Sequence, residues 1–306
     1  MKKVLLILFI TVVPVLAQKV TVVEDIALTT PTEGSFYYPT LNPDGTGILY
    51  SSENHKGLWY KNLTSGKTVK ITDALGAGYD PGFSSRRNEI IYREDKFVKG
   101  KKLSSLISYD LIARKSLVLD EGIRDLKICK SSNRISYDYV RETELRSINK
   151  ENTLQKTNSS EISVVIENSK IVLYENNKKR IIEPLGVGNY IWPSISPDKT
   201  KLLFTFAGKG TYVSNLEGTI LKKIGYANYP SWSPDGNWIL FMKDFDDGTI
   251  ITSSDIFIAD SKGSKFFNLT EKRDDISLYP KWGNSNAEVF YNTDFGQIRK
   301  IKLKYE

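Results

Sequence analysis

Histidine and cysteine, two residue types that often carry chemistry, occur only once each in this 306-residue sequence, as His55 and Cys129. One cysteine cannot form an internal disulfide or a cysteine-based zinc site, and one histidine cannot supply a histidine-rich metal centre. The sequence also has no Gly-x-Ser-x-Gly nucleophile elbow. We therefore predict no catalytic residues, no metal, no cofactor and no enzymatic activity, and we expect His55 to lie exposed in a loop between two strands.

Long apolar runs are equally scarce, and the longest one lies at the start of the chain. Residues 1–17 combine Lys2 and Lys3 with an apolar run and end in small residues, which predicts a secretory signal peptide cleaved after Ala17. Nothing later reaches the ~18 apolar residues that a transmembrane helix needs. We expect a periplasmic or secreted protein without a membrane span, in which residues 18–306 form a single domain.

Charge of one sign is not in strong excess either. The sequence has 43 Lys and Arg against 36 Asp and Glu, a formal net charge of +7, and 40% of its residues are hydrophobic. Such a composition is typical of a folded protein with a mixed-charge surface. We expect no nucleic-acid partner and a monomeric chain.

A pattern with a period of roughly 40 to 50 residues recurs along the sequence, and such a period indicates a propeller, a solenoid or an array. Counted from a proline, a bulky residue follows at +2, an aliphatic residue at +9 and an aromatic residue at +11. The copies start at Pro39, Pro81, Pro193, Pro230 and Pro280. A sixth copy has Leu126 in place of the proline and keeps Ile128, Ile135 and Tyr137.

Each copy reads as four antiparallel strands. The segment Ser233–Gly236, Ser-Pro-Asp-Gly, lies between two apolar strand patterns and is a turn, because proline presets φ, Asp accepts backbone N–H bonds and Gly takes a positive φ. Two further strand-like runs follow the aromatic residue at +11. Four antiparallel strands per copy make one blade of a β-propeller.

The number of blades depends on residues 138–192, where the spacing is irregular. Val165, Val172 and Tyr174 also stand at +2, +9 and +11 from Ser163, but little chain remains between Tyr174 and the next copy. We therefore interpret residues 171–174 as the third strand of the third blade, preceded by an insertion over about residues 141–165. This predicts an all-β, six-bladed propeller, with seven blades as the alternative.

The two ends of the chain predict how the ring closes. Leu28-Thr29 lies ten positions before Tyr38, as Leu269-Thr270 lies ten before Tyr279, and Leu269 ends the outer strand of a blade. The last copy lacks such an outer strand. We expect residues 20–28 to complete the last blade, which would remove the exposed strand edges.

The turn at Tyr229–Gly236, with its relatives at Tyr38–Gly45 and Trp192–Asp198, resembles the WD40-like (PD40) repeat of TolB-type propellers. The resemblance covers nearly all of the chain after residue 17, but only about twenty residues precede Tyr38, too few for the α/β domain that TolB carries before its propeller. It implies a non-enzymatic scaffold for protein–protein interaction in the bacterial cell envelope. The alternative is a glycan-binding or polysaccharide-degrading, lyase-like propeller.

Two groups of residues are candidates for binding. Trp59-Tyr60, Trp238 and Tyr226–Tyr229 lie near predicted loops and could stack on a sugar or a peptide, whereas the aromatic residues at +2 and +11 belong to the core. The insertion at 141–165 and the long loop at 244–254 differ between copies, so we expect them to project from one face and border a partner site.

Overall fold

The computed structural model describes residues 19–84, 88–129, 137–141, 144–148, 154–156, 162–175 and 178–306. These residues form 27 strands and no helix, so this part of the chain holds no helix that could cross a membrane. The predicted signal peptide, residues 1–17, lies outside the described residues.

The strands pair into seven sheets, which we number as blades in chain order. Blade 1 contains β2 (Tyr37–Leu41), β3 (Gly47–Ser51), β4 (Leu58–Asn62) and β5 (Thr68–Thr72), and blade 2 contains β6 (Gly82–Phe83), β7 (Glu89–Val98), β8 (Lys101–Asp110) and β9 (Lys115–Ile123). Blade 3 contains β10 (Lys127–Cys129), β11 (Tyr137–Arg141), β12 (Glu144–Ile148) and β13 (Leu154–Lys156), and blade 4 contains β14 (Ile162–Glu167), β15 (Lys170–Glu175) and β16 (Lys178–Ile182). Blade 5 contains β17 (Tyr190–Ile195), β18 (Lys201–Phe206), β19 (Gly210–Asn215) and β20 (Ile220–Gly225), and blade 6 contains β21 (Asn228–Trp232), β22 (Trp238–Asp246), β23 (Ile251–Asp260) and β24 (Phe266–Asn268). Blade 7 contains β25 (Ser277–Trp282), β26 (Glu288–Thr293), β27 (Ile298–Tyr305) and, from the start of the chain, β1 (Val20–Ala27).

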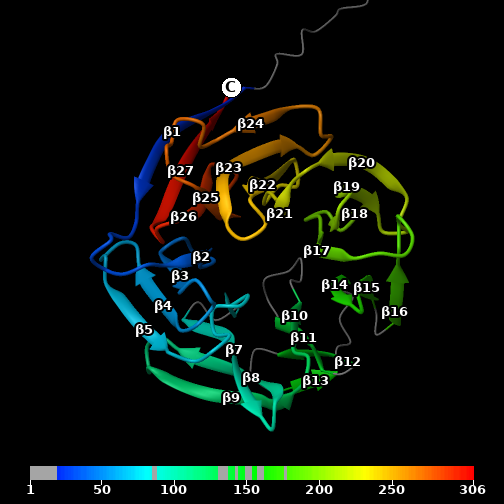
Figure 1. Ribbon diagram of the computed structural model, residues 1–306. Coiled ribbons are helices and arrows are strands. Elements are labelled where there is room, and N and C mark those ends of the chain that lie inside the picture. Colours follow the sequence, from blue (N-terminus) through cyan, green and yellow to red (C-terminus); the bar gives the residue numbers. More distant parts are fainter. Residues whose placement is uncertain are drawn as a thin grey trace, which may run out of the picture.

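The sheets stand around a central axis as the blades of a propeller (Figure 1). Six have four strands, and blade 4 has three among the described residues. The propeller fold is thus confirmed, whereas the interpretation of residues 171–174 as a third strand of blade 3 is wrong. They belong to β15, which pairs with β14 and β16 in a sheet of its own, and this adds a blade to the six expected.

The repeat spacing corresponds to strand pairing. In five blades the residue at +2 lies directly opposite the residue at +9: Leu41 and Ile48, Phe83 and Ile90, Ile195 and Leu202, Trp232 and Ile239, and Trp282 and Val289. Blade 4 has the same register, with Val165 opposite Val172. The degenerate copy starting at Ser163 is therefore a true repeat, and its connections are shorter than those of the other blades.

Blade 3 departs from this register. Ile128 pairs with Tyr139, not with Ile135 as the sixth copy implied, and Ile135 lies outside the described residues. The expected insertion over residues 141–165 is also wrong in large part, because β12, β13 and the start of β14 occupy much of it. The remaining residues of that segment lie outside the described part of the chain.

The turns between first and second strands lie at one face of the ring, which we call the turn face. In blade 6 the Ser233 hydroxyl accepts a bond from the Trp238 N–H (2.9 Å) and donates one to Asp235 (2.7 Å), while Gly236 has a φ of +74°. In blade 5, burial raises the pKa of Asp198, but hydrogen bonds from Ser196 and Thr200 outweigh it and lower this pKa to about 2. The expected turn chemistry is confirmed.

The ring closes as predicted, with β1 antiparallel to β27 at the rim of blade 7. The Lys19 and Glu306 backbones exchange two hydrogen bonds at the end of this pair. Asp25 accepts bonds from Arg299 (2.9 Å), Arg273 (3.1 Å) and the Tyr291 hydroxyl (2.9 Å), so one carboxylate of β1 joins two arginines from the end of the chain.

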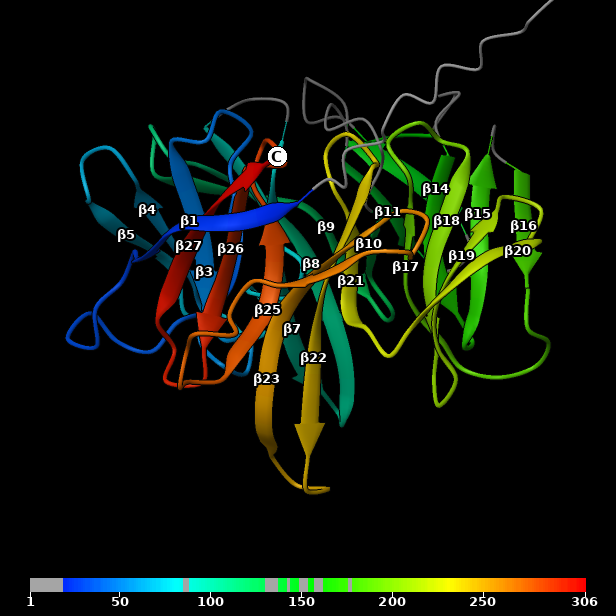
Figure 2. The ribbon, with the colours of Figure 1, turned by 90° about the horizontal axis from the view of Figure 1, so that it is seen from above.

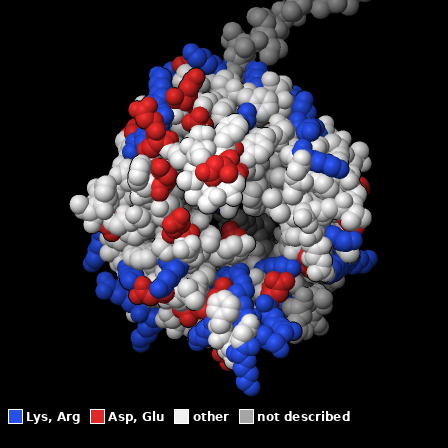
Figure 3. Space-filling model, in the orientation of Figure 1, with Lys and Arg blue, Asp and Glu red and all other residues white. Residues whose placement is uncertain are grey.

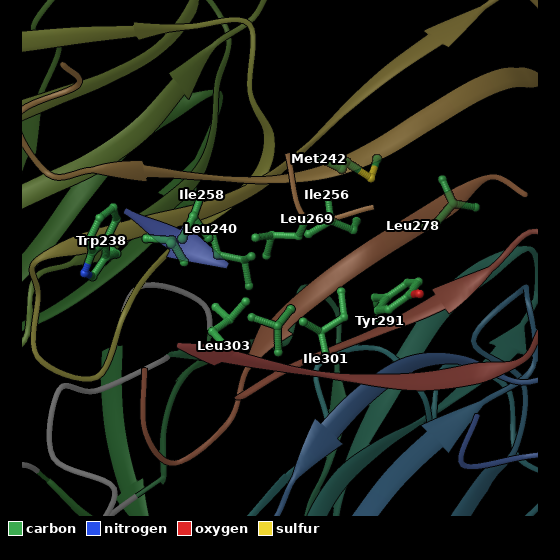
Figure 4. Close-up of a cluster of buried hydrophobic side chains, with 12 residues drawn as sticks. Trp238, Leu240, Met242, Ile256, Ile258, Leu269, Leu278, Tyr291, Ile301 and Leu303 are labelled. Carbon is green, nitrogen blue, oxygen red and sulfur yellow. The ribbon is translucent and has the colours of Figure 1, made fainter. Parts of the chain in front are cut away.

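Neighbouring blades pack face to face through apolar side chains. Figure 4 shows this for blades 6 and 7, where Leu240 and Ile256 meet Tyr291, Ile301 and residues nearby. Burying one such side chain contributes about 1.5–3 kcal/mol. The core therefore lies between neighbouring blades, and the side chains around the central axis of the ring are not part of it.

Candidate functional site: the mouth of the ring

The inner strands of four blades begin with the same distortion. In β2, β17, β21 and β25 the pairing register shifts by one residue, which is a β-bulge. Each bulge contains an aromatic residue directly before a proline, and each of these has a left-handed φ: Tyr38 (+59°), Trp192 (+52°), Tyr229 (+50°) and Tyr279 (+52°). Left-handed backbone costs a residue with a side chain roughly 1–2 kcal/mol, so four costly positions recur at one place in the repeat.

These bulges bring the rings of different blades into contact. Tyr38 packs on Tyr279 (4.5 Å between ring centroids), Tyr279 on Tyr229 (4.8 Å) and Tyr229 on Trp192 (4.6 Å). On the other side of Tyr38, His55 stacks at 3.9 Å, and Tyr79 meets the edge of His55 at 5.3 Å. We call this series of six rings, from Tyr79 to Trp192, the aromatic arc. It runs through blades 2, 1, 7, 6 and 5 in turn.

A cavity of about 610 Å³ completes the circle. Its walls come from blades 1 to 5 and include His55, Tyr79 and Trp192 of the aromatic arc. Ile128 and Val165 line its opposite side. Because the arc also passes through blades 6 and 7, all seven blades contribute to the surroundings of one central hollow, which is visible in Figure 3. We call this end of the ring the mouth face, opposite the turn face.

The charged side of the cavity is built around Arg93, which is 7% exposed. Its guanidinium lies over the Tyr79 ring (4.7 Å), pairs with Asp95 (3.2 Å) and donates to the Leu126 carbonyl (3.2 Å). Asp95 also accepts a bond from Ser104 (2.6 Å) and lies 3.6 Å from the Lys102 ammonium. Gly76 is close beside it, since a Cβ there would lie 2.5 Å from an Asp95 oxygen. Arg93 is thus fixed in place by several contacts.

His55 corrects an expectation from sequence. It is not an exposed loop residue, but a half-buried member of the aromatic arc whose Nδ1 lies 3.1 Å from the Gly78 carbonyl. Burial lowers the pKa of His55 from its ordinary value of 6.5, which favours the neutral ring. In the tautomer that donates to Gly78, the other ring nitrogen is left as an acceptor.

The other aromatic candidates have different fates. Trp238 is 3% exposed and belongs to the core between blades 6 and 7, so its proposed stacking role is wrong. Trp59 packs against Phe36 away from the arc. Tyr229 belongs to the arc, whereas Tyr226 lines a second cavity beside blade 6.

Most of the mouth was not predicted from the sequence, although the sequence contains a signal for it. The Tyr or Trp before each proline also belongs to the repeat motif of the TolB-type propellers that the chain resembles, so it does not stand out as a binding residue. An aromatic residue directly before proline in four of the copies places four rings at equivalent positions. Equivalent positions in a closed ring necessarily face a common axis.

Two hairpins extend from the mouth face beyond the blades that carry them. One is β22–β23, in the region 244–254 where a long connection was expected; the other is β7–β8, which was not anticipated (Figure 2). Asp244 is buried and accepts a bond from Asn228 (2.7 Å), while Asp247 accepts two backbone N–H bonds in the turn. Among the described residues no group of three or more His, Cys, Asp or Glu side chains is arranged to hold a metal ion.

No family model matches the sequence, and no curated protein is significantly similar to it. Solved structures are similar in fold. The β-propeller domain of Cps50 (Swd1) from Myceliophteria thermophila is 9% identical, with a TM-score of 0.63 over 93% of this chain and 99% of that one. An oligogalacturonate lyase from Vibrio parahaemolyticus is 12% identical, with a TM-score of 0.62 over 94% of this chain and 96% of that one.

TolB from Acinetobacter baumannii also matches, with 16% identity and a TM-score of 0.49 over 76% of this chain and 54% of that one. The Cps50 (Swd1) domain and the oligogalacturonate lyase have quite different names and share this architecture, and at such identities the likeness concerns the fold alone. The repeat, the strand pairing and these two likenesses lead to one conclusion: the chain is a β-propeller.

Proposed function

We propose that this chain is a non-enzymatic, exported scaffold of the bacterial cell envelope that binds a protein partner at its mouth face. The observation that carries the proposal is the recurrence, at the mouth, of aromatic residues with a left-handed backbone φ. Strained backbone persists where the surrounding structure enforces it, and it is concentrated at functional sites. Four such positions around one hollow are difficult to explain by folding requirements, since a glycine would fit each of them more easily.

The chemistry of the mouth suits binding. Concave sites that hold ligands are lined mainly by apolar and aromatic side chains with a few fixed polar groups. The aromatic arc provides the aromatic lining, and Arg93 with its partner Asp95 provides the fixed polar groups. Tyrosine, tryptophan and arginine are also the residues that most often dominate protein–protein contacts.

A glycan is the second candidate ligand, and two observations favour it. The arc offers ring faces on which sugar rings could stack, and one structural neighbour is an oligogalacturonate lyase. Lys102, Lys127 and Arg93 on the cavity wall could pair with a uronate carboxylate, although Asp80, Asp95 and Asp125 line the same cavity. This mixed charge is the reason we rank a protein partner first.

The test uses three forms of the chain from residue 18 onward: the parent, Trp192→Ala/Tyr229→Ala, and Ile112→Ala. Ile112 is a 75% exposed apolar residue between β8 and β9, at the turn face and away from the mouth, so it serves as the control. Each form is used to capture partners from native envelope extract, and a captured protein is purified and titrated against all three. Oligogalacturonate is titrated in parallel.

We expect the double variant to weaken binding of the partner at least tenfold, because it removes two adjacent rings of the arc, and Ile112→Ala to leave the affinity unchanged, because it lies on the opposite face. Tight binding of oligogalacturonate that is lost in the double variant would instead support the glycan. A partner that binds all three forms equally would contradict the mouth as the site.

A further inference from the structure

The two long hairpins of the mouth face have longer strands than the equivalent hairpin of blade 1. In blade 2, β7 and β8 have 10 residues each, and in blade 6, β22 and β23 have 9 and 10, whereas β3 and β4 of blade 1 have 5 each. Both hairpins project from the same side of the ring (Figure 2). In the view along the axis, they lie on opposite sides of the central hollow (Figures 1 and 3).

The tip of β7–β8 is basic and apolar. Residues 96–102, which we call the basic tip, read Lys-Phe-Val-Lys-Gly-Lys-Lys. Phe97 is 67% exposed at its end. Lys102 lies near Asp95, but Lys96, Lys99 and Lys101 have no carboxylate within ion-pair distance among the described residues. Three exposed cations therefore stand at this tip, beside the exposed phenyl ring of Phe97, which also borders the mouth cavity.

The tip of β22–β23 has the opposite charge. Residues 244–250, the acidic tip, read Asp-Phe-Asp-Asp-Gly-Thr-Ile. Phe245 is 67% exposed, and neither Asp246 nor Asp247 has a cationic partner among the described residues. Figure 3 shows the contrast, with acidic side chains over β22–β23 on one side of the hollow and basic ones over β7–β8 on the other.

An apolar groove runs beside the acidic tip. It has a volume of about 520 Å³ and is lined by Tyr226, Phe245 and Phe266 together with Asp244, Asp246 and one cation, Lys243, which lies over the Phe257 ring (4.4 Å). It could receive a phenyl ring, and the exposed carboxylates of Asp246 and Asp247 at the tip could meet ammonium groups beside that ring. The basic tip presents a phenylalanine flanked by lysines, which is the complementary arrangement.

We propose that the mouth face binds a second copy of this chain, with the basic tip of each copy on the acidic tip and groove of the other. A two-fold axis that lies in the plane of the mouth and passes between the hairpins brings two rings face to face. The same rotation places each basic tip opposite an acidic one. Both contacts form together, so the assembly closes as a dimer and leaves no unpaired tip.

A second copy is the occupant that the two tips favour, because this chain carries both halves of the complementary surface. Each contact between a basic tip and an acidic tip would bury two exposed phenylalanines and bring together at least five charges that have no ion-pair partner among the described residues. The contact is confined to tips, so we expect a weak, salt-sensitive dimer in place of the monomer predicted from sequence. The dimer would enclose the mouths of both rings, so a protein partner at the mouth would have to displace the second copy.

Charge reversal provides a sharp test. Variant one carries Lys96→Glu, Lys99→Glu and Lys101→Glu, so that both of its tips are acidic; variant two carries Asp246→Lys and Asp247→Lys, so that both are basic. Each variant alone should be monomeric in sedimentation velocity at concentrations where the parent chain dimerises. An equimolar mixture should recover the dimer, because every contact then joins an acidic tip to a basic one.

A third variant carrying all five substitutions should dimerise by itself, and Phe97→Ala should weaken the parent dimer at least tenfold without changing any charge. The parent dimer should also dissociate in 0.5 M salt. A parent chain that stays monomeric at 200 µM, a single-reversal variant that still dimerises, or a mixture that stays monomeric would each overturn the proposal.

Melting curves establish that every variant is folded before it is analysed. The dimer rests on the hairpin tips and the partner site on the aromatic arc, so Trp192→Ala/Tyr229→Ala should dimerise like the parent, because neither residue belongs to a tip. Since a second copy and a protein partner would compete for the mouth face, partner binding is titrated at a chain concentration at which the parent is monomeric. Loss of partner binding in this double variant with an intact dimer would support the mouth as the partner site, and loss of the dimer in the charge-reversal variants with intact partner binding would support the hairpin contact.

Discussion

The two ends of a blade are built from the same repeat but by different means. At the turn face, Ser233 and Asp235 satisfy backbone N–H groups, and Gly236 supplies the positive φ. At the mouth face, a few residues earlier in the same copy, the positive φ belongs to Tyr229. In blade 6 the turn face thus uses residue types that suit its backbone, whereas the mouth face keeps an aromatic ring at a backbone position that disfavours one. The turn of blade 5 is less favourable, because Lys199 has the positive φ (+61°) at the glycine position. The difference distinguishes residues that stabilise the turn from residues that place an aromatic side chain at the mouth at a cost to folding.

The largest expected effect comes from opening the closed ring, on which both ends of every blade depend. Deleting residues 18–29 takes away β1, its pairing with β27 and the Asp25 carboxylate that joins Arg273 and Arg299. An open strand edge and exposed apolar contacts should then lower the melting temperature by ten degrees or more, on the scale of about 4 °C or less per kcal/mol for a protein of this size. Thermal unfolding followed by circular dichroism measures this.

The control for that deletion is the chain that starts at residue 18, since it lacks only the predicted signal peptide. A truncated chain that melts within a degree or two of this control would show that closure by β1 adds little to stability.

A smaller effect distinguishes the two ends directly. At Trp192 and Tyr229, glycine should give a more stable protein than alanine, by about 0.5–1 kcal/mol for each position, because glycine tolerates the left-handed φ and alanine does not. At Leu221, an exposed residue of β20 whose φ is not positive, the order should be reversed, since glycine weakens an ordinary strand. Denaturant unfolding of the three alanine–glycine pairs measures both orders.

If alanine were the more stable residue at Trp192 and Tyr229 as well, the bulges would not be strained in solution. The mouth would then not retain its aromatic residues against a folding cost, and their recurrence would not indicate a functional site.

Most of the fold could be predicted because each repeat records its own strand pairing. The spacing from +2 to +9 is the register of one hairpin, so Trp232 and Ile239 had to face each other once a turn stood between them. Closure could be predicted for the same reason, since Leu28-Thr29 repeats the spacing of Leu269-Thr270. Blade 4 was missed because its connections are short, and a minimum length taken from other blades excluded it.

The mouth could be predicted only in part, because its geometry depends on contacts between copies. No spacing within one repeat brings His55 onto Tyr38 or Tyr229 onto Trp192; the closed ring does so. The basic hairpin was missed for another reason. Its extra residues lengthen β7 and β8 equally, so the distance between successive copies stays within the usual range, and only the pairing from Glu89 to Val98 shows the extension.

The smallest expected effect concerns protonation of His55 at the mouth. Burial lowers the pKa of His55 in the folded chain below 6.5, its ordinary value when unfolded. Between these two pKa values the unfolded chain binds more protons than the folded chain. The free energy of unfolding should therefore fall as the pH drops through 6.5, whereas above this pH the titration of His55 should not change it.

His55→Gln keeps a polar side chain that does not titrate. The difference in unfolding free energy between the parent and this variant, measured by denaturant unfolding from pH 8 to pH 5, isolates the one histidine, because carboxylates and the amino terminus are common to both. We expect that difference to shift in favour of His55→Gln as the pH decreases. A difference that stays constant with pH would mean that His55 titrates alike in both states, as an exposed loop residue would, and its place within the aromatic arc would then be wrong.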